Sequence, residues 1–304
     1  MNRESLIPHI KLNWKVICHT KTDINRMKWW YNSISKEYWL FVLSEDSNKI
    51  FILNALTGKY IKSLGSPGDK VGQFDLPKDI LIYENYIFVL EKNNHRIQIF
   101  TLPDLKFISF IGEVELTNPT CLESVKLRKD KKNFCCLLVG DNLDNKPSRN
   151  KCYFKFIFEL NEVNIYDLEI KRNEPKNNSK LGYIESIKYD GLNDNLYIID
   201  KLSKDIKIFN FNDEFKFTIF KNFFKGDPSQ IQQINGYTIV GDFSRLENFF
   251  HIFDNNFKYI NSFVSDFTLK NNCFCIINHN NNNIIYSNDE DRYSIVLHNF
   301  MSYI

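Results

Sequence analysis

Six acidic residues recur at one position of a repeated pattern, directly after a short apolar run and directly before a polar turn. They are Glu45, Glu91, Asp141, Asp200, Asp242 and Asp289, and successive members lie 42 to 59 residues apart. Carboxylate oxygens are the ligands that hard cations such as Ca²⁺ prefer, so carboxylates at one level of a ring are candidate metal ligands. The same side chains also accept backbone N–H bonds in turns, which is their commoner use. Both interpretations stay open at this stage.

Two lysines follow acidic strand ends and are candidate phosphate contacts, because an ammonium group meets a phosphate as a point charge. They are Lys92 and Lys201. A solvated surface position is the alternative for both. Trp29 and Trp30 are interpreted as packing residues between sheets, in preference to a stacking platform for nucleic-acid bases.

Composition excludes several classes of function. The formal net charge is +2 and no long basic block occurs, so a dominant electrostatic footprint for nucleic acid is not supported. No apolar run reaches the roughly 18 residues of a membrane span, and the N-terminus lacks the apolar core of a signal peptide. The seven cysteines lack the spacing of a zinc site and are interpreted as buried thiols. We therefore expect a soluble, cytoplasmic protein.

The elements that must position the acids are short strands. Each acid closes one apolar run and is followed, after a turn, by a second run that alternates apolar and polar residues, as in Arg96–Phe100 and Asp205–Phe209. Alternation with period two is typical of a half-buried strand. Intervals of this length hold four short strands each, the size of a propeller blade. The polar stretches 141–151 and 171–180 are interpreted as surface loops.

The pattern predicts an all-β fold, a six-bladed β-propeller whose ring is closed by an N-terminal strand that completes the last blade. Residues 11–19 read as a strand before the first repeat, and the last repeat lacks its outer strand. We expect residues 11–19 to pair with Ser294–Asn299. The chain is then one domain, 1–304, with blades at 20–65, 66–112, 113–170, 171–221, 222–265 and 266–304 plus 11–19.

One segment, Gly65 to Gly112, resembles an NHL repeat. The matching residues are Gly72, Phe74, Pro77, Glu91, Asn94, His95, Arg96, Ile97, Ile99 and Phe100. The resemblance implies a propeller blade. It also implies that the turn containing His95 is structural, although a histidine is chemically suited to acid–base work near neutral pH.

The order of the whole chain resembles the phytase-like propellers, over most of residues 20–300. In that family a Glu-Gly strand and a strand ending in paired acids line a calcium-rich cleft. Glu185 matches the first glutamate and Asp200 the first of the paired acids, whereas Lys201 replaces the second, and Ser229-Gln230 stand in place of a later Glu-Gly pair. The resemblance implies that the candidate metal or ligand carboxylates are Asp141, Asp144, Glu185, Asp200 and Asp242.

These observations predict a binding or scaffold protein that engages a protein partner or a small anionic ligand on one face of the ring. The alternative is a calcium-dependent phosphoric-ester hydrolase, a degenerate phytase-like phosphomonoesterase in which bridging cations polarise the phosphate. No cofactor is assigned for the first, and calcium is the cofactor of the second. Whether the chain catalyses a reaction stays open, because one fold hosts both scaffolds and enzymes.

Overall fold

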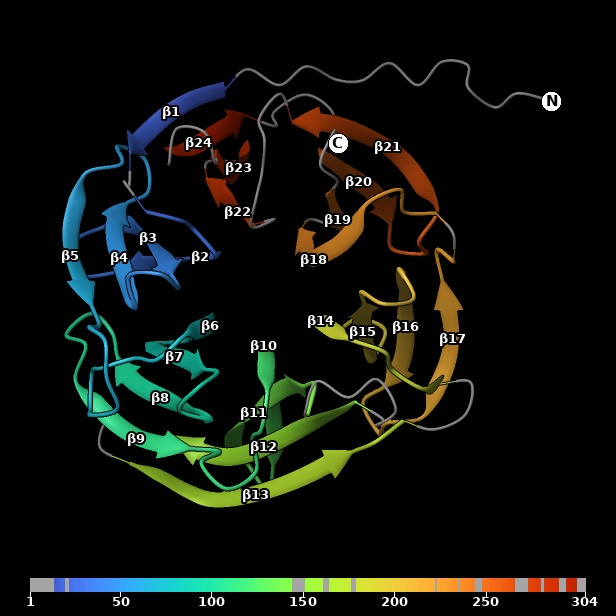
Figure 1. The fold of residues 1–304 in the computed structure, drawn as a ribbon, viewed down its shortest axis with the longest axis horizontal. Helices are drawn as coiled ribbons and strands as arrows, with labels where there is room; N and C mark the ends of the chain where they lie inside the picture. The colour runs from blue at the N-terminus through green and yellow to red at the C-terminus, as the bar shows by residue number, and fades with distance from the viewer. Residues whose placement is uncertain are drawn as a thin grey trace.

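The chain forms a circle of four-stranded antiparallel sheets around a central axis (Figure 1). The computed structural model describes residues 14–19, 22–143, 151–160, 164–175, 179–221, 223–234, 236–243, 248–265, 273–279, 282–289 and 294–299. In each sheet made of consecutive strands the first strand lies nearest the axis and the last lies on the circumference (Figure 1).

Five sheets are blades made of four consecutive strands. Blade 1 contains β2 (Arg26–Asn32), β3 (Glu37–Ser44), β4 (Lys49–Asn54) and β5 (Tyr60–Leu64). Blade 2 contains β6 (Pro77–Tyr83), β7 (Tyr86–Glu91), β8 (Arg96–Thr101) and β9 (Phe107–Ile111). Blade 3 contains β10 (Pro119–Lys129), β11 (Lys132–Asp141), β12 (Cys152–Leu160) and β13 (Ile165–Asn173). Blade 4 contains β14 (Ile184–Asp190), β15 (Asn195–Asp200), β16 (Asp205–Asn210) and β17 (Phe215–Ile219). Blade 5 contains β18 (Asp227–Ile234), β19 (Tyr237–Phe243), β20 (Asn248–Asp254) and β21 (Tyr259–Ser265).

A further sheet combines the two ends of the chain. It contains β22 (Phe274–His279), β23 (Asn282–Asp289), β24 (Ser294–Asn299) and β1 (Trp14–His19), in the order β1-β24-β23-β22. Strand β1 runs antiparallel to β24, with Trp14 opposite His298 and His19 opposite Ser294. These are the two segments that the sequence analysis expected to pair.

The expectation of six equivalent blades is nevertheless corrected. The structure has five blades, each made of four consecutive strands. The composite sheet differs, because it combines one strand from the N-terminal end of the chain with three from the C-terminal end. In blade 3, β13 continues to Asn173, past the boundary expected at residue 170.

The core consists of apolar layers between neighbouring sheets, because successive side chains of a strand point to opposite faces. In β8, Ile97 and Ile99 pack toward blade 3, whereas Phe100 packs toward blade 1. Strand β22 behaves in the same way: Cys275 packs with blade 1 and Phe274 with blade 5. The innermost strand of the composite sheet therefore fills the gap between the last continuous blade and the first.

Loss of the β1–β24 pairing should destabilise the protein strongly. Removing Trp14–His19 leaves the backbone groups along one edge of β24 without the partners they have in the intact sheet. We expect the free energy of unfolding to fall by about 3–5 kcal/mol, at about 1 kcal/mol for each lost hydrogen bond. Urea denaturation followed by circular dichroism measures this. A segment of equal length in which proline replaces every second residue lacks half of the N–H donors and should not restore the loss; full restoration would contradict the pairing.

Candidate functional site

The strand-end carboxylates tie each blade to the segment that enters it. Asp200, at the end of β15, is almost completely buried and accepts hydrogen bonds from the backbone N–H groups of Gly182 (2.7 Å) and Tyr183 (3.0 Å), just before β14. It also accepts one from Leu202 (3.1 Å) in the turn that follows β15. One carboxylate thus holds three parts of the blade and satisfies buried donors that have no strand partner.

The same arrangement recurs in three other blades. Asp141 accepts bonds from the N–H groups of Thr117 (2.7 Å) and Asn118 (3.0 Å), and Asp242 from those of Lys225 (3.0 Å) and Gly226 (2.8 Å). Glu91 accepts one from Asp75 (3.1 Å). Four of the six predicted acids are therefore acceptors for backbone donors, as the simpler of the two sequence interpretations expected.

In three of these blades a polar side chain on the third strand also contacts the acid. That side chain lies two residues after the residue that stands opposite the acid in the sheet. Gln98 Nε2 donates to Glu91 Oε1 at 2.9 Å, and Lys207 Nζ donates to Asp200 Oδ2 at 2.8 Å. His251 Nε2 lies 3.4 Å from Asp242 Oδ2. Lys207 also contacts Asp205 at 2.9 Å, so its buried ammonium lies between two carboxylates. An amide, an ammonium group and an imidazole thus occupy equivalent positions.

Glycine is required where a carboxylate approaches the backbone closely. A Cβ at Gly226 would lie 2.3 Å from the carbonyl oxygen of Phe243 and 2.8 Å from Asp242 Oδ1. At Gly182 a Cβ would lie 3.0 Å from Asp200 Oδ1. These two glycines therefore give the acids access to the N–H groups that they accept from.

The prediction for Glu45 is wrong by one residue. Ser44 ends β3 opposite Lys49, as Asp200 ends β15 opposite Asp205, so Ser44 holds the equivalent position. Glu45 is the first residue of the following turn, the place that Lys92 and Lys201 hold in their blades, and its carboxylate pairs with Lys78 Nζ at 2.7 Å. Asp289 ends β23 opposite Ser294, but its side chain is not described.

The backbone geometry of His95 agrees with a structural role in its turn. Its φ is +51°, and the last residues of the equivalent turns, Asn48 and Lys204, have φ of +50° and +51°. The side chain of His95 is exposed. Its place is therefore explained by the left-handed turn that joins two antiparallel strands.

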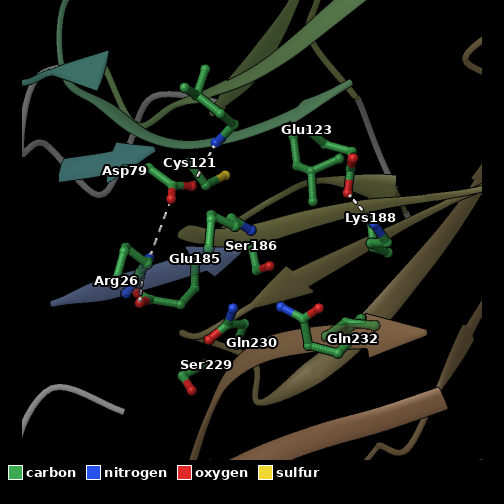
Figure 2. Close-up of a pocket in the computed structure, with 14 residues that line it drawn as sticks. Arg26, Asp79, Cys121, Glu123, Glu185, Ser186, Lys188, Ser229, Gln230 and Gln232 are labelled. Atoms are coloured by element: carbon green, nitrogen blue, oxygen red, sulfur yellow. Dashed lines mark hydrogen bonds and ion pairs between the residues drawn. The ribbon is translucent and has the colours of Figure 1, made fainter. Parts of the chain in front are cut away.

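A small polar cavity lies on the axis, between the innermost strands (Figure 2). In blades 2 to 5 the register of that strand shifts close to its start, at Lys78, Thr120, Glu185 and Ser229. A bulge of this kind re-aims side chains. The cavity lining is Arg26, Lys28, Asp79, Cys121, Leu122, Glu123, Glu185, Ser186, Ile187, Lys188, Ser229, Gln230, Ile231 and Gln232.

Arg26 is the charged centre of this cavity. Its Nη2 lies 3.5 Å from Glu185 Oε1 of blade 4 and its Nε lies 3.7 Å from Asp79 Oδ1 of blade 2 (Figure 2). Burial opposes the charged form of Arg26, but the carboxylates of Asp79 and Glu185 outweigh it and raise its pKa. The guanidinium therefore stays charged and links three blades across the axis.

Other side chains satisfy the open edges of the innermost strands. Asp79 accepts bonds from the N–H groups of Ile80 and Leu122, both at 2.8 Å, and Lys188 Nζ pairs with Glu123 at 2.7 Å (Figure 2). Burial raises the pKa of the Cys121 thiol to about 12, so it is neutral at physiological pH and not a nucleophile. The cavity volume is about 20 Å³, which is space for one water molecule.

The structure brings only part of the predicted site together. Glu185, Ser229 and Gln230 line the axial cavity, and Lys201 Nζ lies 3.8 Å from Glu185 Oε2. The candidates Asp141, Asp200 and Asp242 do not line it; they are held within their own blades as described above. Asp144 lies outside the described residues. Among the side chains that the structure describes, no group of three or more His, Cys, Asp or Glu is placed to hold a metal ion.

Arg26 and Asp79 are not among the residues predicted from the sequence. Neither belongs to the acidic repeat, and their partners are distant in the chain. The sequence feature that could have indicated them is the presence of charged residues near the start of a largely apolar innermost strand, as in "RMKWWYN" and "PKDILIY". Charged groups in such runs are usually paired, which indicates an axial ion pair without naming its partner.

A larger groove lies on the face of the circle opposite the strand-end acids. On this face the first strand of each blade turns back into the second. Its volume is about 600 Å³ and it lies between blades 1 and 2. Trp30, whose Nε1 donates to the carbonyl of Glu84 at 3.0 Å, packs against Trp39 and so belongs to the inter-blade layer, as predicted. We call this the blade 1–2 groove; its lining is Trp30, Ser33, Ile34, Glu84, Asn85, Tyr86, Thr101, Leu102, Pro103, Asp104 and Lys106.

Radial four-stranded sheets around an axial channel define a β-propeller. Solved structures share this fold. A luciferin-regenerating enzyme is 9% identical, with 96% of each chain covered and a TM-score of 0.61. Hydrazine synthase of Kuenenia stuttgartiensis is 11% identical over 87% of this chain and 81% of the other, with a TM-score of 0.55. A chain of a nidogen/laminin complex is 12% identical over 74% and 75%, with a TM-score of 0.51.

At these identities the likeness shows the fold alone. No protein-family model matches the sequence, and no curated protein matches it. The propeller is therefore established, whereas membership of the NHL or phytase-like families in particular is not supported. The neighbours include enzymes and a chain from a protein complex, so the fold does not select a function.

Substitution of Asp200 should show the structural role of the strand-end acids. We expect Asp200→Ala to lower the free energy of unfolding by about 3–5 kcal/mol at neutral pH, because it removes a partner of the buried Lys207 and leaves N–H donors unsatisfied. Burial alone would raise the pKa of Asp200, but bonds from Lys207 and Gly182 outweigh it and lower the pKa. The stabilisation is thus present above the ordinary pKa of about 3.9 and is lost as the pH falls through the lowered native value.

Urea denaturation of wild type and variant from pH 7 to pH 3 measures this difference, which should shrink at the acid end. The exposed Asp104→Ala is the control and should change stability by less than about 0.5 kcal/mol. An Asp200→Ala protein as stable as the wild type would contradict the assignment.

Removal of the axial cation should take from Asp79 its ion pair with Arg26 and leave Glu185 with the more exposed Lys201, 3.8 Å away. We expect Arg26→Met to cost about 3 kcal/mol, because Asp79 and Glu185 then face each other's charge in a buried setting. Adding Glu185→Gln to that variant should recover about 1 kcal/mol, because it removes one of the two charges. Thermal melting of the single and double variants tests this; a double variant less stable than Arg26→Met would show that the pairing with Glu185 contributes nothing.

Proposed function

We propose that the chain is a binding module, and that a protein partner docks through an extended segment in the blade 1–2 groove. The observation that carries the proposal is one of size. The groove encloses about 600 Å³, which is in the range of ligand sites, whereas the axial cavity has room for a single water molecule.

The chemistry of the groove supports a peptide as its occupant. Aromatic and aliphatic side chains form its floor, and Ile34 at its rim is 78% exposed. The exposed turn residues Ser33 and Asn85 lie beside them. The groove therefore offers an extended segment both apolar contacts, from Trp30, Ile34 and Leu102, and polar groups with which it can form hydrogen bonds.

The hydrolase alternative has less support. A phosphoric-ester hydrolase of this kind needs carboxylates that share a cation. The carboxylates of Asp141, Asp200 and Asp242 instead accept donors from their own blades, and Glu185 faces Arg26 and Lys201. Two fixed cations at one carboxylate compete with a metal ion for it.

The remaining expectations stay predictions. Lys92 and Lys201 lie in turns on the face opposite the groove, so a small anion bound there would be a separate event from partner docking. In the described part of the chain no helix has the length and apolarity to cross a membrane. A cytoplasmic location is part of the proposal.

A selection of displayed peptides about ten residues long tests the proposed function. Peptides enriched on the wild-type protein are measured by fluorescence anisotropy against Ile34→Asp. The new carboxylate lies at the apolar rim, so binding should weaken at least tenfold, which corresponds to about 1.4 kcal/mol.

The matched control is Val114→Asp, since Val114 is 91% exposed and lies outside the groove. It should bind the same peptides with unchanged affinity. Peptides that bind both variants and wild type equally would place the site elsewhere, and a selection that enriches nothing would remove the support for a peptide-binding role.

A further inference from the structure

Strand β13 is unusual among the outer strands of the ring. It spans Ile165–Asn173, nine residues, whereas the outer strands β5, β9 and β17 have five each. It is the last strand of its sheet and lies on the circumference (Figure 1). Its outer edge therefore presents a long row of backbone N–H and C=O groups.

The exposed side chains of β13 are both apolar and charged. Tyr166, Leu168 and Ile170 are exposed large hydrophobic residues. A left-handed residue, Asp167 with φ of +53°, interrupts the strand near its start, and the strand is regular beyond it. Charge usually protects an edge from pairing, but the charges of this regular part differ in sign, so they oppose a partner strand in some registers only.

The charges along this part of the strand are self-complementary. Glu169 and Lys171 lie on one face of the strand, where their side chains pair with each other at 3.0 Å within the chain, and Leu168, Ile170 and Arg172 lie on the other face. In an antiparallel pair of identical strands centred on Ile170, Glu169 of each copy stands opposite Lys171 of the other. Registers centred on Glu169 or on Lys171 would instead place identical charges directly opposite each other, which is destabilising.

We propose that two copies of this chain associate through β13, edge to edge and antiparallel, with the twofold axis at Ile170. The two third blades then form one continuous eight-stranded sheet. Two Glu169–Lys171 pairs lie on one side of the junction. On the other side Ile170 meets its own copy, flanked by Leu168 and the aliphatic part of Arg172. This isologous contact is separate from the blade 1–2 groove.

Cysteine cross-linking tests the register. Directly opposed residues of an antiparallel pair have Cα atoms about 4.5–5.5 Å apart, within the range of a disulfide. Ile170→Cys should therefore form a disulfide-linked dimer on mild oxidation, which a reducing agent reverses. Leu168→Cys is the matched control, because it stands opposite Arg172, and it should cross-link at least tenfold less. The cysteines whose side chains are described are buried and do not compete.

Charge exchange tests the pairing in the protein without added cysteines. Sedimentation should give the wild type twice the mass of one chain. Glu169→Lys places like charges opposite each other at both symmetric positions and should raise the dissociation constant about tenfold. The double variant Glu169→Lys with Lys171→Glu restores opposite charges and should return the dissociation constant to within about twofold of wild type. Unchanged circular dichroism shows that each variant is folded.

A wild-type chain that stays monomeric up to about 100 μM overturns the proposal. So does a dimer that ignores Glu169→Lys, or one in which Leu168→Cys cross-links and Ile170→Cys does not. Each of these results leaves the peptide-binding proposal untouched, because Ile34 and the groove lie in other blades.

Discussion

The buried carboxylate at the end of the second strand is the interaction on which the blades depend. A radial sheet must begin at the axis, and the segment that reaches that point brings N–H groups with no strand to pair with. In blades 2 to 5 the carboxylate accepts them, as Asp200 does for Gly182 and Tyr183. A buried, unsatisfied donor destabilises a protein by about 1–3 kcal/mol. The carboxylate removes this destabilisation, which the radial arrangement of the sheets would otherwise cause.

Variation around that carboxylate is tolerated because it needs donors and not one particular residue. Gln98, Lys207 and His251 occupy equivalent positions, and each reaches the acid from the third strand. Blade 1 shows the limit of this rule. There Ser44 replaces the acid, its hydroxyl meeting Thr22 Oγ1 at 2.7 Å, and the turn is held in part by Asn25, which accepts the N–H of Glu45.

Ion pairs stabilise the axis of the ring, whereas hydrogen bonds stabilise the individual blades. Arg26, Asp79 and Glu185 come from three blades, and their ion pairs cross the only part of the ring where the innermost strands face one another. This interior leaves little space for a ligand. Recognition is therefore better served by the periphery, where the blade 1–2 groove and the outer edge of β13 present surfaces that the fold itself does not use.

The sequence by itself determined the local elements of this protein. Period-two runs ending in an acid and a turn indicate strand ends, and the described structure has strands and no α-helix at these places. Hydrophobic alternation and turn chemistry are local, so they can be read without knowing any neighbour. The same locality explains the errors. The pattern predicts the strand end at Glu45, whereas it lies at Ser44, because both are polar residues next to the apolar run. It predicts a loop at residues 171–180, because an exposed edge strand is as polar as a loop, whereas β13 extends to Asn173.

Only the tertiary structure decided which charged groups meet. Nothing near Arg26 in the chain names Asp79 or Glu185 as its partners, since the three are brought together by the curvature of the whole ring. The same closure separates Asp141, Asp200 and Asp242 from Glu185, although all four are acids in one stretch of sequence, because each strand end is held inside its own blade. Equal positions in a repeat place residues at equal heights around an axis. Whether they touch depends on their distance from that axis, which no single repeat encodes.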